Sequence, residues 1–150
     1  MAAEIAALDR LLRNSGYTTG VFASHAGSAA VPGTQPLAEY PGTPDDWLLL
    51  HYGSEPVGYN FVLTAAGMKA VLYHGIPPAG LYAQLDPLRA AGAARAGKGL
   101  AVLASRCAVS AAYSRPAAAE LEASGFADPL VLPPLWDGGG FAEPDPGLLQ

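Results

Sequence analysis

Residues 47–50 (WLLL) and 70–73 (AVLY) are two continuous apolar runs that decide the fold class of this chain. Polar residues bound them, with two aspartates before the first run and a histidine directly after each. A short, uninterrupted apolar run is typical of a strand that is buried on both faces, as in a parallel sheet. Residues 109–113 and 130–132 have the same character. We therefore expect four strands of a mainly parallel sheet.

The segments between these runs show helical spacing and helix-end signals. Ile5, Leu8, Leu11 and Leu12 recur at helical intervals, and Gly16 follows as a C-cap residue would. We expect helices over residues 2–14, 55–66, 82–106 and 114–124, a short strand over 18–23 and a loop over 24–45. Strands that alternate with helices predict βαβ units. The expected fold class is therefore α/β, with a Rossmann-like, mainly parallel sheet flanked by helices.

The order of the elements predicts that a first strand is missing. The chain opens on a helix, whereas the first strand of a doubly wound sheet is usually central. We therefore expect a chain that is trimmed at both ends. A missing central strand would leave backbone groups unpaired, which favours marginal stability or a homo-oligomer that fills the gap.

Length and composition are those of one domain. The chain has 150 residues, of which 51% are hydrophobic and 14% charged, so a disordered acidic chain is excluded. We expect a domain over residues 1–132 and a Pro- and Gly-rich tail of linker composition over 133–150. The single cysteine, Cys107, is expected in the core. We see neither a secretory signal nor an apolar span of ~20 residues, so a cytoplasmic location is expected.

Charge is distributed unevenly along the chain. The net charge is −5, yet residues 87–115 carry five basic residues and no acidic one. Such a block indicates an anionic partner, an anionic lipid surface or simply a solvated helix face. Nucleic acid is not expected as a partner, because the whole chain is acidic and only Tyr113 offers an aromatic ring near the block.

Polar and small residues collect where the expected strands end. The three histidines, His25, His51 and His74, each lie just past an expected strand. Ligands of open parallel sheets bind outside the carboxyl ends of the strands, where helix N-termini also point. The candidates for substrate binding are His51, Gly53, Ser54, Gly75 and Ser114. Both serines are followed at the second position by proline, the signature of a helix start. Serine and glycine are also common in loops that bind nothing, so both interpretations stay open.

Motifs that would identify a specific chemistry are absent or incomplete. Residues 92–99 (GAARAGKG) imitate a phosphate-binding P-loop, but Gly99 stands where Ser or Thr should hold magnesium, and no strand leads into the motif. No Gly-x-Ser-x-Gly elbow exists, which argues against a serine hydrolase of the α/β type. Three histidines can bind zinc, but these lack local ligand spacing, so no metal site is expected.

Four segments, taken together, resemble a known enzyme family. They are HYGSEP (51–56), VLYHGIPPAGLY (71–82), AAYSRPAAAELEASGF (111–126) and VLPPLWD (131–137). In order and spacing they are similar to the N-terminal domain of family 4 glycosyltransferases, over most of the chain from Ala2 to Asp137. The resemblance implies one half of a GT-B architecture, in which two Rossmann-like domains enclose the active site. It also makes the tail over 133–150 similar to the interdomain linker.

The resemblance implies a function as well. In such enzymes the N-terminal domain binds the acceptor, which is often lipid-linked. The C-terminal domain binds the nucleotide-sugar, which is a substrate rather than a cofactor. His74 corresponds to the histidine that lies near the donor sugar and its β-phosphate, and it is the catalytic candidate. The sugar would be transferred with retained configuration and without an obligatory metal.

The same resemblance sets expectations about partners. We expect no transferase activity unless a donor-binding domain or subunit is present. Related enzymes act at the inner membrane surface, where Arg89, Arg95 and Arg106 of this chain would lie against anionic headgroups in a peripheral contact.

Two other functions are compatible with the same residues. One is a non-catalytic binding or interaction module that keeps the fold without the chemistry. The other is an unrelated doubly wound enzyme, such as a sugar-nucleotide epimerase or dehydrogenase. The second lacks support, because no Gly-x-Gly-x-x-Gly fingerprint follows a strand.

Overall fold

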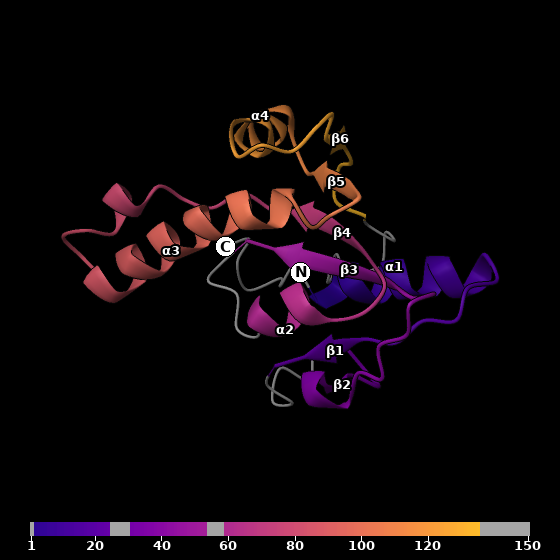
Figure 1. Ribbon diagram of the computed structural model, residues 1–150. Coiled ribbons are helices and arrows are strands. Elements are labelled where there is room, and N and C mark those ends of the chain that lie inside the picture. Colours follow the sequence, from indigo (N-terminus) through magenta and orange to yellow (C-terminus); the bar gives the residue numbers. More distant parts are fainter. Residues whose placement is uncertain (1, 25–30, 54–58, 136–150) are drawn as a thin grey trace, which may run out of the picture. The chain divides into compact units, whose positions relative to one another are not determined.

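The computed structural model describes residues 2–24, 31–53 and 59–135 (Figure 1). The chain divides into two compact units, one built on the residues up to Tyr40 and the other spanning Pro41–Pro133. The boundary falls within the segment that the sequence predicts as a loop. The two units are described separately, and the second contains the parallel sheet.

The first unit begins with helix α1 (Ala2–Asn14), which confirms the predicted helix. Gly16 has φ +89°, a left-handed conformation that glycine adopts without strain. Its N–H donates to the carbonyl of Arg13, and the N–H of Tyr17 donates to the carbonyl of Leu12, each at 3.0 Å. These two bonds satisfy carbonyls that the helix end would otherwise leave unpaired, as in a Schellman motif. The expected role of Gly16 as a C-cap residue is therefore confirmed.

The segment after α1 bonds back to the helix through one carboxylate. Asp9 accepts from Nε of Arg13 at 2.9 Å and from the hydroxyl of Thr19 at 2.5 Å. The Arg13 side chain also donates to the carbonyl of Thr19 at 2.7 Å. The hydrogen bonds from Arg13 and Thr19 lower the pKa of Asp9 below its ordinary value of 3.8. Asp9 therefore remains ionised and fixes the direction in which the chain leaves the helix.

Two short strands complete the described part of the first unit. β1 (Phe22–Ala23) pairs in parallel with β2 (Gln35–Pro36), and a 3-10 turn, η1 (Leu37–Glu39), follows. The prediction of a strand over 18–23 was therefore too long, because only its last two residues have a pairing partner. The prediction of a loop over 24–45 missed β2 and η1.

The second unit contains a parallel sheet of four strands in the order β3-β4-β5-β6 (Figure 1). The strands are β3 (Trp47–Tyr52), β4 (Met68–Tyr73), β5 (Val109–Ala112) and β6 (Leu130–Val131). Each pairs in parallel with its neighbour, and the register aligns Tyr52, Tyr73 and Ala112 across three strands. The predicted parallel sheet is confirmed, and β3 extends two residues beyond the apolar run that predicted it.

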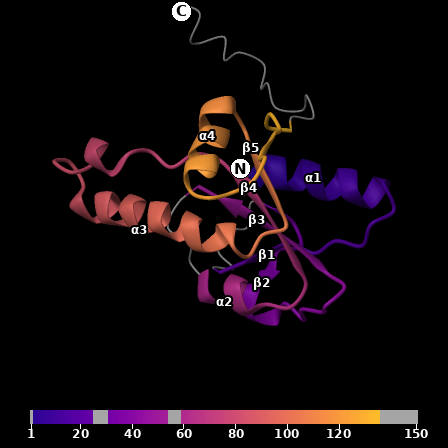
Figure 2. The same ribbon diagram turned by 45° about the horizontal axis from the view of Figure 1, so that its top comes forward.

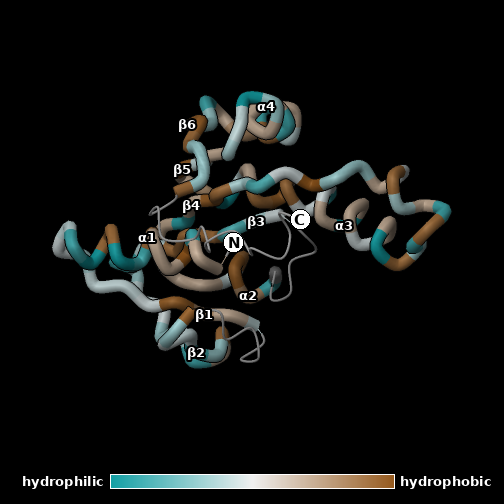
Figure 3. Tube along the Cα trace, turned by 180° about the vertical axis from the view of Figure 1, so that it is seen from behind, coloured by the Kyte–Doolittle hydropathy of each residue, from teal (hydrophilic) through white to brown (hydrophobic). Residues whose placement is uncertain are grey.

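Three helices connect these strands and cover one face of the sheet. They are α2 (Tyr59–Thr64), α3 (Pro87–Ala104) and α4 (Arg115–Ala123). A strand order that advances in one direction places all right-handed crossovers on the same face. The core agrees, since buried side chains of the strands and of all three helices form one cluster: Tyr52, Val62, Val71, Tyr73, Leu100, Leu103, Ala112 and Leu121. In Figure 3 the hydrophobic colour follows much of β4 to β6, whereas α4 is mixed, as expected of a helix with one face on the core.

The start of α3 differs from the prediction. The sequence predicts a helix from residue 82, but the helix begins at Pro87, after a 3-10 turn, η2 (Ala79–Leu81). Asp86 is the N-cap, and its carboxylate accepts from the N–H of Arg89 at 2.9 Å. Figures 1 and 2 show the segment before α3 extending past the helix start and turning back. Proline is favoured at the first helical position, so Asp86 and Pro87 together fix this start.

The other helices match their predictions more closely. Ser114 is the N-cap of α4, and its hydroxyl accepts from the N–H of Ala117 at 3.3 Å, as the Ser-x-Pro pattern predicts. The predicted helix over 55–66 is represented by α2, and residues 54–58, with the predicted cap Ser54, lie outside the described residues. The P-loop-like stretch 92–99 lies inside α3, so its amides take part in a helix rather than a phosphate loop.

Candidate functional site

Three side chains from neighbouring strands meet at the carboxyl edge of the second unit's sheet. His51 is in β3, His74 directly follows β4, and Tyr113 directly follows β5. The backbone ladder continues one residue past the strands, because His74 N–H donates to the Tyr52 carbonyl at 2.8 Å and Tyr113 N–H donates to the Tyr73 carbonyl at 3.2 Å. The register and the alternation of side chains along a strand place all three on the same face. We refer to them as the His51–His74–Tyr113 cluster.

The two imidazoles of the cluster are joined nitrogen to nitrogen. Nδ1 of His51 lies 3.1 Å from Nε2 of His74, and the ring centroids are 5.3 Å apart. That centroid separation is close to the largest that this nitrogen–nitrogen distance permits, so each nitrogen points almost straight at the other. The contact is therefore an N–H···N hydrogen bond, in which one ring donates and the other accepts.

Tyr113 contacts His74 in a different way. Its hydroxyl lies 3.3 Å from Nε2 of His74, but the ring centroids are only 4.4 Å apart, with the planes tilted by 56°. The tyrosine ring therefore lies against the face of the imidazole rather than end-on to its nitrogen. A ring nitrogen has one proton or one lone pair, and His51 already lies along that direction. Tyr113 thus restricts the ring by packing, while His51 bonds to it.

The hydrogen bond couples the protonation of the two rings. If Nε2 of His74 carries the shared proton, a neutral His51 must carry its own proton on Nε2; in the opposite arrangement a neutral His74 is protonated on Nδ1. A proton gained at one outer nitrogen can be matched by release from the other. The pair can therefore donate to or accept from a hydroxyl or phosphate oxygen, and it can pass a proton between its two ends.

Two glycines shape the loops around His74. A Cβ atom at Gly53 would lie 2.9 Å from Cβ of His74, closer than such atoms approach, so any larger residue would force one of the two segments to shift. Gly75 has φ +89°, with open space around it, so its backbone conformation rather than crowding requires glycine. Both were predicted to bind substrate. The structure gives each of them a role in placing His74.

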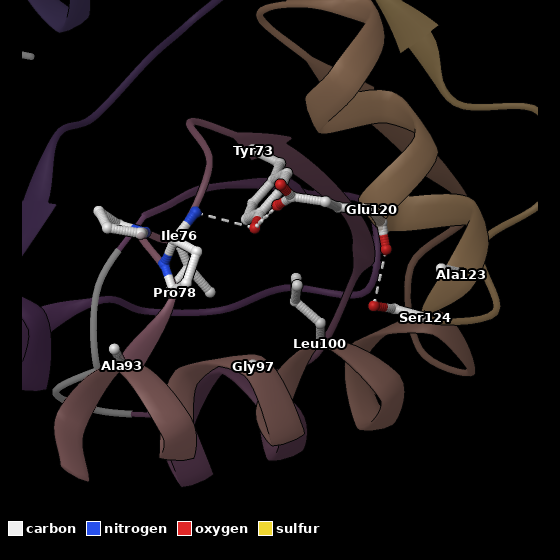
Figure 4. A pocket seen from close by; sticks show the side chains of 10 residues that line it. Tyr73, Ile76, Pro78, Ala93, Gly97, Leu100, Glu120, Ala123 and Ser124 are labelled. Carbon is white, nitrogen blue, oxygen red and sulfur yellow. Dashed lines mark hydrogen bonds between the residues drawn. The ribbon is translucent and has the colours of Figure 1, made fainter. Parts of the chain in front are cut away.

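The loop that carries His74 is closed by a neighbouring tyrosine. The hydroxyl of Tyr73 accepts from the N–H of Ile76 at 2.9 Å and donates to Oε2 of Glu120 at 2.5 Å (Figure 4). Burial and the Glu120 carboxylate raise the pKa of this phenol above its usual value of 10. Tyr73 therefore remains a neutral donor, and it holds the turn that contains His74 and Gly75.

Sequence reasoning missed Tyr113, Tyr73 and Glu120 as parts of this region. Tyr113 had a usable signal, because it follows β5 just as His74 follows β4. The bond between Tyr73 and Glu120 spans 47 positions in the sequence and carries no local pattern. Of the other predicted residues, Ser114 follows Tyr113 and caps α4, whereas His25 and Ser54 lie outside the described residues.

Metal ligands, membrane-spanning helices and the single cysteine can also be checked in the described residues. Within residues 2–24, 31–53 and 59–135, no three His, Cys, Asp or Glu side chains converge as metal ligands would. None of the helices in the described part of the chain combines the length and apolar character needed to cross a bilayer. Cys107 is half-buried and packs against the core, as predicted, and burial raises the pKa of its thiol.

The fold and the cluster define an α/β protein with a parallel sheet and a polar group of residues at its carboxyl edge. Comparison with protein-family models, with curated proteins and with solved structures finds no match. The function therefore has to be argued from the cluster and from the resemblance described above.

Proposed function

We propose that this chain is the acceptor-binding half of a retaining glycosyltransferase of GT-B architecture, which moves a sugar from a nucleotide-sugar to an acceptor. The supporting observation is the hydrogen bond between His51 and His74 at the carboxyl edge of the sheet. Open parallel sheets bind their ligands at this edge, and the resemblance puts the family's active-site histidine at His74.

In this proposal His74 is the catalytic residue, and it bonds to a sugar hydroxyl or a phosphate oxygen. His51 and Tyr113 are positioning residues in this proposal, because each contacts the His74 ring. Because Nε2 of His74 already faces His51, the hydrogen bond between the rings sets the orientation in which His74 meets a ligand. A preorganised hydrogen-bond donor such as His74 stabilises the charge that develops on a leaving diphosphate. The domain that binds the nucleotide-sugar would supply the remaining stabilising groups.

Sugar binding at the cluster can be tested by NMR of the histidine rings. The chain has three histidines, so ring nitrogens labelled with ¹⁵N give few signals to assign. We expect saturable shifts of His51 and His74 when mono- and disaccharide acceptors or nucleotide-sugars are added. The variant His74→Ala should lose the effect. Met68→Ala, at the opposite end of the same strand, should keep it.

Turnover separates the proposal from a binding module that has the same fold. The purified chain should bind a saccharide but release no nucleoside diphosphate from any nucleotide-sugar. A chain that contains a donor-binding domain should show transfer that His74→Ala abolishes. Transfer that His74→Ala leaves unchanged would favour the non-catalytic role of this half. The absence of any saccharide binding would contradict the proposed glycosyltransferase function.

A further inference from the structure

A hollow lies on the helical side of the second unit's sheet, apart from the histidine cluster. It measures about 290 Å³ and lies between the loop after His74, helix α3 and helix α4 (Figure 4). The residues that line it are Tyr73, Ile76, Pro77, Pro78, Ala93, Gly97, Leu100, Glu120, Ala123 and Ser124. Its size is near the lower end of the range for pockets that bind small molecules.

The walls of this pocket are mostly apolar. Ile76, Pro77 and Pro78 form one side, and Ala93, Gly97 and Leu100 of α3 form the opposite side. A Cβ atom at Gly97 would have no heavy atom within 4 Å, so the space above this helix position is open. The pocket therefore offers a slot for an apolar group between the prolines and a helix surface made of small residues.

One charged group faces this slot. Among the ten described residues that line the pocket, Glu120 alone has a charged side chain. Its Oε2 atom accepts from Tyr73, but a carboxylate has acceptor sites for several more hydrogen bonds. The hydroxyl of Ser124 donates to the backbone carbonyl of Glu120 at 2.8 Å and so does not compete for the carboxylate. The basic residues of α3, Arg89, Arg95 and Lys98, are not among the lining residues.

We propose that this pocket binds a small organic cation, namely a protonated amine on a compact apolar body. The ammonium group lies at the Glu120 carboxylate, and the apolar body lies between Pro77, Pro78 and the small residues of α3. An anion is disfavoured, because none of the described lining residues is a cation that offsets the charge of Glu120. This site goes beyond the proposed sugar transfer, which uses the opposite face of the sheet.

The pocket and the His51–His74–Tyr113 cluster share the loop after β4. A ligand that occupies the pocket can therefore be detected at the cluster. Tyr73 lines the pocket and directly precedes His74, and its hydroxyl holds the N–H of Ile76. A cation that bonds to Glu120 alters the partner of the Tyr73 hydroxyl. Filling the pocket therefore shifts the ring signals of His74 as well as the amide signals of Ile76.

Three probes of matched size test the proposal: benzylammonium, benzyl alcohol and benzoate. Titrations of the intact chain, followed by amide and histidine-ring NMR, give a dissociation constant for each. We expect benzylammonium to bind about fivefold more tightly than benzyl alcohol, which is the size of effect that an exposed ion pair gives. Benzoate should bind least tightly of the three. Glu120→Gln keeps an acceptor for Tyr73 and should abolish the preference for the cation.

Variants that fill the pocket complete the test. Gly97→Leu places a side chain in the open space, and Ala123→Leu narrows the pocket from α4; both should abolish binding of benzylammonium. Ala94→Leu adds the same side chain at an exposed position of α3 and should leave binding unchanged. Equal affinities for the three probes, or binding that survives both filling variants, would overturn the proposal. Neither result bears on saccharide binding at His74.

Discussion

Nδ1 of His51 and Nε2 of His74 lie 3.1 Å apart and point at each other, which ties the end of β3 to the loop after β4. The two residues are separated by 23 positions in the sequence and come together because their strands pair in parallel. The orientation of the His74 ring, and the nitrogen on which it carries a proton, therefore depend on His51.

His51→Ala should release the His74 ring. Without its hydrogen-bond partner, His74 exchanges between tautomers and orientations, and we expect saccharide affinity to fall about tenfold, the order of one hydrogen bond. His51→Asn is the matched control, since an asparagine amide occupies nearly the position of Nδ1 and should restore most of the affinity. Ring ¹⁵N shifts of His74 measure the tautomer directly. An unchanged His74 spectrum in His51→Ala would show that the bond does not position the ring.

Gly53→Ala should displace His74. The new Cβ would lie 2.9 Å from Cβ of His74, so one of the two chain segments must shift. We expect a loss of about 1–3 kcal/mol in the free energy of unfolding, as for overpacked sites, together with loss of the His51–His74 bond. Gly80→Ala is the control, because a Cβ there meets nothing within 4 Å. Chemical denaturation that shows equal stability for both variants would contradict the close approach.

Tyr73→Phe should loosen the loop that carries His74. The substitution leaves the N–H of Ile76 without its acceptor, at a cost of about 1–2 kcal/mol. Tyr52→Phe removes a comparable buried bond, from the Tyr52 hydroxyl to the carbonyl of Ala96, without touching this loop. Both variants should lose stability in denaturation, but only Tyr73→Phe should broaden or shift the ring signals of His74. If both variants affect His74 alike, Tyr73 has no special positioning role.

The end of α1 should be sensitive to acid. The pKa of Asp9 is lowered in the folded chain, so the stabilisation from its bonds to Arg13 and Thr19 is complete above the ordinary value of 3.8. It is lost as the pH falls through the lower, folded pKa. Amide hydrogen exchange in α1 should therefore accelerate, relative to its intrinsic rate, more below the ordinary pKa of 3.8 than it does between pH 5 and pH 7. Asp9→Asn should weaken α1 already at neutral pH and remove this acid dependence.

The strands of the second unit were predictable because each contains a short, mostly apolar run. The boundary of β3 was not, since the polar His51 interrupts the apolar run, whereas in the structure His51 and Tyr52 both pair with β4, at Leu72 and Tyr73. The start of α3 was predicted too early, because apolar residues such as Leu85 continue the helical pattern on the N-terminal side of the true cap, Asp86.

The candidate site was partly predictable for the same reason. Parallel strands bring their carboxyl ends to one edge, so the position of His51 and His74 near each other follows from the strand pattern alone. Which nitrogens meet, and that Tyr113 lies on the His74 ring, depends on register and on side-chain reach. The bond from Tyr73 to Glu120 depends on how α4 packs on the sheet, which no local pattern specifies.

A crystal structure of the chain with the saccharide that binds best in the NMR titrations tests the proposed site most directly. We expect a sugar hydroxyl within hydrogen-bond distance, about 2.5–3.2 Å, of an imidazole nitrogen of His74, with Tyr113 still against the ring. A sugar bound elsewhere, with the bond between His51 and His74 unchanged and no contact to either ring, would contradict the assignment of this edge to sugar transfer.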